Sequence, residues 1–281
     1  MTIRKAGSLI VLAKEAGSKF KVLLLQRSSH GYFGGLAVFP GGAVHPSDAN
    51  PDYTCLLPKQ QRSWFKTHSN YAIAALRETF EEAGLLLLDP WVKLTKEENL
   101  ELRKKVLNDP TQFISISRTL LRVPILHKLI YWSNWVSPLH MEKHRFDTHF
   151  FLTVINQEQK QDLSLEADGR ETLKALWMTP EEALEAYSRK ELKLLPPQYC
   201  TLKQLCETSI DDLEKEIQDI KSNRKVPAYM PEFLRPSEDG GGIFALPGDK
   251  EYSKPGEFEN RLIMYRKDGK VDDIKWLRSK L

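Results

Sequence analysis

A crowded group of acids on one short segment constrains this chain more than any other feature of its sequence. The segment runs from Arg77 to Leu85, and its helical part is expected to stop at Gly84. On a helix turning about 100° per residue, Glu78, Glu81 and Glu82 project from one face. The opposite face collects apolar residues suited to a core: Ile73, Leu76, Phe80 and Ala83.

Nothing in the local structure rewards three acids at this spacing. Like charges three and four residues apart repel, and the last helical turn also disfavours anions. A solvated acidic face is one explanation of Glu78, Glu81 and Glu82. The other is a divalent cation, which takes oxygen ligands and offsets the repulsion. The Gly41-Gly42 pair upstream favours the cation, because glycine lets a backbone approach a metal or ligand closely.

Together these segments resemble the signature of the Nudix hydrolases, which reads Gly, five residues, Glu, seven residues, then Arg-Glu-U-x-Glu-Glu-x-Gly-U, where U is bulky and aliphatic. The second half matches from Arg77 to Leu85 except at Thr79. The first half matches at Gly42, but Asp48 replaces the first Glu, and residues 49–76 make a spacer of 28 residues.

The interrupted signature looks like the peroxisomal motif 19 type of Nudix hydrolase, a coenzyme A diphosphatase. The stretches 24–28 and 38–42 add to this similarity, which extends from about residue 7 to the C terminus. The resemblance implies an α/β fold, a Nudix α/β/α sandwich with a mixed β-sheet. The expected organisation is a Nudix domain over 1–222 and a C-terminal extension over 223–281 that packs on it. Two insertions fall within the domain, at 49–70 in the box and, as helices, at 95–121.

The resemblance also implies an activity, the metal-dependent hydrolysis of the diphosphate of coenzyme A or acyl-CoA to 3′,5′-ADP and (acyl)phosphopantetheine. Two alternatives stay open. One is a broader dinucleotide diphosphatase acting on NADH or ADP-ribose. The other is an inactive nucleotide-binding module, motivated by Asp48, Thr79 and the long spacer.

Site roles carry over residue by residue from this resemblance. Glu78, Glu81 and Glu82 are expected to hold Mg2+ or Mn2+, with the carbonyl of Gly42. Arg77 is expected to orient these glutamates. The attacking water would lose its proton to Glu81 or to an acid outside the box, Glu171, with Glu166 a further candidate ligand or base. Substrate contacts are expected from Arg27, Gly41 and Glu171. For Arg27 the alternative is a surface arginine that pairs with an acid, and for Glu166 and Glu171 it is a solvated acid of a loop. Trp135 is expected in the core, or stacked on adenine.

Composition limits the kinds of partner and of cellular compartment that fit this chain. A net charge of +3 argues against a dedicated nucleic-acid surface, and no stretch approaches the ~20 apolar residues of a membrane span. Three cysteines without metal-ligand spacing fit a reducing compartment. Ser279-Lys280-Leu281 matches the address read by the peroxisomal import receptor, so we expect a peroxisomal location; the alternative is a chance tripeptide.

Periodicity and capping residues predict the remaining elements. A hairpin is expected from 7–13 and 20–26, and helices are expected at 95–108, 114–121 and from Thr179. One long helix is predicted from Pro196 to about Lys221, and the last ten residues are expected to be extended and exposed. Strands are predicted at 36–39, 85–88, 129–136, 145–154 and 173–177, and at 242–246 and 261–265, where we expect pairing at an edge of the main fold.

Overall fold

The structure is a computed structural model of the whole chain. It describes the residues from 3 to 279 with internal gaps, and every structural statement below refers to these residues. The described ranges are 3–17, 19–27, 35–55, 62–138, 145–156, 159–160, 172–218, 226, 228–267 and 269–279.

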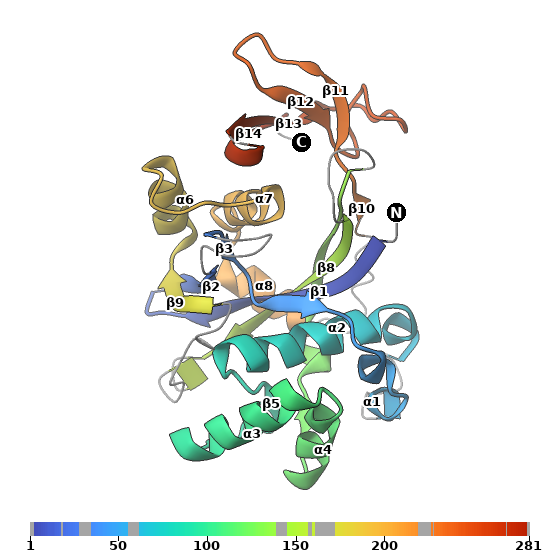
Figure 1. Cartoon of the computed structure of the whole chain (residues 1–281), viewed down its shortest axis with the longest axis vertical. Coiled ribbons are helices and arrows are strands. Elements are labelled where there is room, and N and C mark those ends of the chain that lie inside the picture. The colour runs from blue at the N-terminus through green and yellow to red at the C-terminus, as the bar shows by residue number, and fades with distance from the viewer. Residues whose placement is uncertain are drawn as a thin grey trace.

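An eight-stranded mixed sheet forms the centre of the described molecule (Figure 1). Its strand order is β10-β7-β8-β1-β2-β3, with β4 paired to β1 and β9 paired to β2. The strands β1 and β8 run parallel, whereas β1 and β2 form the expected antiparallel hairpin. The bounds are β1 (Ile3–Lys14), β2 (Phe20–Arg27), β3 (Ala37–Val38), β4 (Gly41–Ala43), β7 (Ile130–Val136), β8 (Arg145–Ile155), β9 (Thr172–Met178) and β10 (Ala228–Tyr229).

Helices cover both faces of this sheet, which gives the expected α/β/α arrangement (Figure 1). The helices α2 to α4 lie on one side, and α6 to α8 lie on the other. Alternate residues of β1 serve the two layers, because Leu9 and Val11 pack in the cluster with α2 while Ile10 and Leu12 pack in the cluster with α7 and α8. The helix bounds are α1 (Asp52–Cys55), α2 (Arg62–Ala83), α3 (Lys96–Asn108), α4 (Gln112–Thr119), α6 (Pro180–Ser188), α7 (Pro196–Leu205) and α8 (Ile210–Gln218), with short 3-10 turns η1 (Pro46–Ala49) and η3 (Leu126–Lys128).

The capping residues read from the sequence are confirmed. Thr95 accepts a hydrogen bond from the backbone N–H of Glu98, whose side chain in turn accepts from the Thr95 N–H. Thr179 and Glu182 make the same reciprocal pair at the start of α6. Each box satisfies two backbone N–H groups that have no partner inside the helix.

The C-terminal strands form a sheet of their own, in which the two strands predicted at 242–246 and 261–265 pair with each other as expected. The order is β11-β12-β13-β14, all antiparallel, while only β10 joins the main sheet, beside β7. Phe244, Leu262 and Ile274 of this second sheet pack in the same apolar cluster as α7 and α8. Its strands are β11 (Glu232–Pro236), β12 (Gly242–Ala245), β13 (Asn260–Lys267) and β14 (Lys270–Arg278).

Three predictions about individual elements are corrected. The expected strand at 85–88 reduces to β5 (Leu88–Asp89), paired with β6 (Val123–Pro124). The helix expected from Pro196 to Lys221 breaks after Leu205 and restarts at Ile210. Of the last ten residues, 272–278 are extended as expected, but they belong to β14, where Ile274 is buried.

Strand β1 and helix α2 meet at backbone distance. A Cβ atom on Gly7 would lie 2.0 Å from the carbonyl oxygen of Tyr71 and 2.9 Å from the backbone nitrogen of Ala75. Only glycine fits here, so the backbone of α2 rests directly on the strand. None of the described helices is long and apolar enough to cross a bilayer.

Candidate active site

The Arg77 side chain is the centre of a buried polar cluster. Its exposed fraction is 2%, and its Nη1 donates to one carboxylate oxygen of Glu78 at 2.7 Å and one of Glu81 at 2.8 Å. Its Nη2 also donates to the carbonyl oxygen of Ala43 at 3.0 Å. One guanidinium thus fixes two acids of the α2 face, because its planar fork can serve several oxygens at once.

Asp48 binds the opposite edge of the same guanidinium. Its two oxygens accept from Nε and Nη2 of Arg77 at 2.9 and 3.0 Å, and one of them also accepts from the His45 N–H at 2.8 Å. The Asp48 residue is 1% exposed. The shorter side chain therefore still reaches Arg77, and it joins the two halves of the interrupted signature.

Burial dominates the electrostatics of the two acids that share Arg77. It raises the pKa of Glu78 to about 7, with the charge of Glu81 adding to the rise and Arg77 opposing it. Burial also raises the pKa of Glu81, again against Arg77. Each carboxylate therefore gains from any further positive charge brought to this face.

Glu82 faces the glycine turn. Its Oε2 accepts from the Gly41 N–H at 2.9 Å, and its Oε1 lies 3.3 Å from Nη1 of Arg27. The residue is 7% exposed. The structure thus brings the predicted substrate contact Arg27 and the predicted box acid Glu82 together.

The two glycines of the turn leave no room for side chains. A Cβ on Gly42 would lie 2.4 Å from the carboxyl carbon of Glu78, and a Cβ on Gly41 would lie 2.5 Å from the carbonyl oxygen of Gly7. Both contacts are closer than a real Cβ tolerates. The backbone of the turn consequently lies directly against the acidic face of α2.

The carboxylate and backbone oxygens of this site are of the type that binds a hard divalent cation. Its ligands would be carboxylate oxygens, with a glycine backbone beside Glu78, and the raised pKa of Glu78 reflects buried negative charge that a cation would stabilise. Within the described ranges, no three such groups already converge on one point, because Glu82 turns to Gly41 and Arg27.

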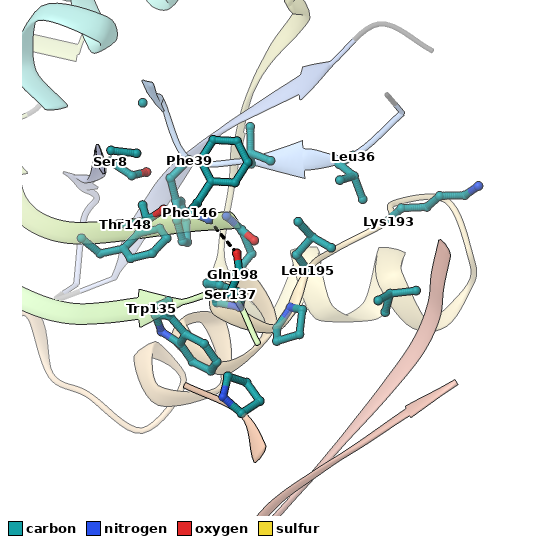
Figure 2. A pocket seen from close by; sticks show the side chains of 18 of the residues that line it. Ser8, Leu36, Phe39, Trp135, Ser137, Phe146, Thr148, Lys193, Leu195 and Gln198 are labelled. Carbon is teal, nitrogen blue, oxygen red and sulfur yellow. Dashed lines mark hydrogen bonds between the residues drawn. The ribbon is translucent and has the colours of Figure 1, made fainter. Parts of the chain in front are cut away.

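A cavity of about 870 Å³ opens beside the glycine turn, and the turn forms part of its wall. Gly41, Gly42 and Arg27 line it next to the acidic face. Figure 2 shows an apolar and aromatic interior that includes Phe39 and Trp135. Trp135 is 7% exposed and stacks on Tyr229 with ring centroids 4.9 Å apart, so it is both a core residue and a cavity wall.

Arg103 of the inserted helix α3 holds the end of α2, a role that the sequence did not reveal. Its Nε donates to the backbone carbonyl of Glu81 at 2.6 Å and its Nη2 to that of Glu82 at 2.7 Å. Asn99 adds a bond to the carbonyl of Gly84 at 2.8 Å. The last helical carbonyls have no partner within a helix, so α3 supplies partners for the turn that carries two site acids.

Replacing Arg103 by Met should lower the free energy of unfolding by about 3 kcal/mol, because two buried carbonyls lose charged donors. Urea unfolding would measure the loss. Lys104→Met, at the exposed neighbouring position on α3, is the matched control and should change stability by less than about 0.5 kcal/mol. Equal losses in the two variants would contradict this role of Arg103.

Several predicted residues lie at or beyond the edge of the described structure. Glu166 and Glu171 fall outside the described residues, as do Lys280 and Leu281. Ser279 is exposed, and its N–H donates to the carbonyl of Glu259 at 2.9 Å.

Comparison with known proteins gives independent evidence on the family of this chain. Residues 59–205 match the family model described as the NUDT19 Nudix domain. A Gallus gallus protein named acyl-coenzyme A diphosphatase NUDT19 is 30% identical, over 96% of this chain and 85% of its own length. A Homo sapiens protein of the same name is 29% identical, over 91% and 78%. Among solved structures, a NUDIX hydrolase from Alicyclobacillus acidocaldarius is similar at a TM-score of 0.61 and 25% identity, over 76% of this chain and 96% of that one.

Proposed function

This chain belongs to the NUDT19 Nudix family, and from that membership we propose that it hydrolyses the diphosphate bridge of coenzyme A or acyl-CoA. The products would be 3′,5′-ADP and (acyl)phosphopantetheine. The observation that carries the proposal is the continuity of the acidic face with the cavity. Gly41, Gly42 and Arg27 line the cavity and also contact the acids of α2.

Nudix hydrolases depend on divalent metal ions, and we propose Mg2+ or Mn2+ here. Glu78, Glu81 and Glu82 would hold the ion, with the carbonyl of Gly42. When bound, it would polarise the phosphoryl oxygens and lower the pKa of a bound water.

The other catalytic roles belong to side chains of the protein. Arg77 holds Glu78 and Glu81 in place through its Nη1 group. Arg27 lies at the junction of cavity and acidic face, where its positive charge would neutralise a diphosphate oxygen. Glu81 would take the proton of the attacking water, because its carboxylate lies on the acidic face where that water would be held. Glu171 stays the alternative base and substrate contact.

We also propose the location and organisation expected above. A peroxisomal import receptor would read Ser279-Lys280-Leu281 where the tripeptide carries a free carboxylate. The chain would comprise a Nudix domain over 1–222 and an extension over 223–281 that completes the cavity wall. Met264 and Val271 of that extension line the cavity, which supports this division of labour.

The test is a substrate panel. With Mg2+ or Mn2+, the purified full chain should convert coenzyme A and acyl-CoA to 3′,5′-ADP, identified by mass, and EDTA should abolish the conversion. Cleavage of NADH or ADP-ribose with coenzyme A left intact would instead support the broader dinucleotide diphosphatase. No cleavage of any diphosphate would support the inactive binding module.

A further inference from the structure

The cavity has a basic rim that belongs to the C-terminal sheet. Arg266, Lys267 and Lys270 flank the turn between β13 and β14, and all three line the cavity. Lys193, which precedes α7, lines it from another side. All four side chains are exposed. The Nudix signature contributes none of them, so they are an addition to the catalytic face.

Among the described residues, two other cations of the same sheet have acidic partners, unlike the lysines of this rim. Elsewhere in it, Arg261 pairs with Asp249 at 2.9 Å and Lys275 with Asp239 at 3.1 Å. Within the described part of the chain, no carboxylate pairs with Lys193, Lys267 or Lys270. The sheet thus leaves its lysines without acidic partners where they face the cavity.

An acid near the rim is already occupied. Asp272 also lines the cavity, but its carboxylate lies 3.6 Å from Nζ of Lys190. The Nη1 group of Arg266 donates to the carbonyl of Gly269 at 3.2 Å, which holds the guanidinium beside the turn. The rim therefore presents net positive charge to anything in the cavity.

The start of β14, just after the basic turn, is anchored to α6. The Tyr187 hydroxyl donates to the carboxylate of Asp273 at 3.0 Å, and Nζ of Lys190 donates to the Asp272 carbonyl at 3.0 Å. Met264 and Ile274, one on each strand of the hairpin, are buried in the cluster shared with α6 and α7. The backbone that carries the basic turn is consequently held in position before a ligand arrives, which lowers the entropy lost on binding.

The floor of the cavity offers a second recognition element. Gln198, in the first turn of α7, is 6% exposed, and its Oε1 has no hydrogen-bond partner within the described structure. It lines the same cavity as Phe39, Trp135 and Phe146, all labelled in Figure 2. A buried acceptor without a partner costs free energy, so the Gln198 side chain would gain a hydrogen bond by turning its Oε1, which is closed to solvent here, toward an N–H donor on a ligand.

Both halves of coenzyme A could supply such a donor, and the charge on the rim distinguishes them. Adenine has an amino group and pantetheine has amide N–H groups. Beyond the diphosphate, however, the pantetheine half is neutral, whereas the nucleotide half carries a phosphate on its ribose with close to two negative charges. A basic rim gains nothing from the neutral half.

We propose that this cavity binds the nucleotide half of coenzyme A and that Arg266, Lys267 and Lys270 bind its 3′-phosphate. Adenine would lie on the apolar floor with its amino group at Gln198. The inference rests on the proposed function and deepens it, because it makes the β13–β14 turn the element that separates coenzyme A from dinucleotides without a 3′-phosphate.

The experiment compares coenzyme A with dephospho-coenzyme A, which lacks only the 3′-phosphate. In the double variant Lys267→Glu/Lys270→Glu, the ratio of the two kcat/KM values should fall about 10- to 100-fold. The matched control is Lys104→Glu/Lys254→Glu, which changes the net charge equally at exposed positions outside the cavity lining. Its ratio should stay within about two-fold of the wild type.

Product binding supplies a second measurement that does not depend on turnover. Calorimetry should show that 3′,5′-ADP binds the wild type more tightly than 5′-AMP, and that the rim variant loses this difference while the control keeps it. If the wild type cleaves coenzyme A but neither ratio responds to the rim variant, the 3′-phosphate site is wrong and the proposed function stands. If coenzyme A is not cleaved, the proposed function fails, and the calorimetric comparison still decides whether the rim reads a 3′-phosphate.

Discussion

Replacing Glu82 by Gln should lower kcat for coenzyme A hydrolysis by roughly 10²- to 10³-fold. The amide has nearly the same shape as the carboxylate, and its oxygen can still accept the Gly41 N–H that Glu82 accepts at 2.9 Å. What disappears is the negative charge at the junction of the acidic face, the glycine turn and Arg27. Steady-state kinetics with saturating Mg2+ would measure the change.

Two controls make the Glu82 result interpretable. Glu97→Gln removes a charge from an exposed position on α3 and should leave kcat within about two-fold of the wild type. Urea unfolding of Glu82→Gln should stay close to the wild type, which separates a chemical loss from a folding loss. A Glu82→Gln enzyme as active as the wild type would show that the box is not the catalytic site.

Replacing Arg77 by Met should lower the free energy of unfolding by about 3–5 kcal/mol. Methionine fills much of the same volume, but it leaves the carboxylates of Asp48, Glu78 and Glu81 without the guanidinium that contacts all three. Buried carboxylates without a counter-charge are costly, as the raised pKa of Glu78 already indicates with Arg77 present. Urea denaturation of both proteins would measure the difference.

Removing one of the stranded charges should restore part of the loss. The double variant Arg77→Met/Asp48→Asn should lose less free energy of unfolding than the sum of the losses in the two single variants. The difference, which is the coupling energy, should be about 1–3 kcal/mol. Arg77→Lys should remain destabilised, because one ammonium cannot replace a fork that serves Asp48, Glu78 and Ala43 at once. Strict additivity in the double variant would rule out the buried network as the cause.

Local patterns predicted the parts of the fold that depend on neighbouring residues. The acid-bearing helix, the hairpin of β1 and β2, and the capping boxes of α3 and α6 all follow from spacing within a few residues. The α/β/α sandwich with a mixed sheet followed from the resemblance carried by the interrupted signature.

Long-range structure explains most of the errors. Four leucines at 85–88 are buried, but only Leu88 finds a strand partner, since an apolar run can be buried without pairing. The break between α7 and α8 has a readable signal that was missed, because the Ser209 hydroxyl accepts from the Asp211 N–H at the start of α8. Strands β11 to β14 alternate like any exposed hairpin, and nothing local says which sheet they join.

The residues of the candidate site also fall into those that the sequence could predict and those that it could not. The acids, the arginine and the glycines of the signature could be named from sequence because the family pattern fixes their type and order. Contacts from distant segments could not be named, as with Arg103, which approaches Glu81 and Glu82 across 22 and 21 residues. An arginine on an amphipathic helix reads as a surface residue until the packing of that helix is known.

The backbone contact at Gly7 explains how a box split by 28 residues keeps its geometry. Three residues of β1, Ala6 to Ser8, pair with Ala43 to Gly41 on one edge, while α2 rests on the same Gly7 through Tyr71 and Ala75. Both halves of the box thus lie against the same residue of β1, the second half through Tyr71 and Ala75 at the end of the spacer. A change in the length of the spacer before Tyr71 would therefore cost only about 0.6 kcal/mol of chain entropy for each doubling, without moving an acid relative to the glycine turn.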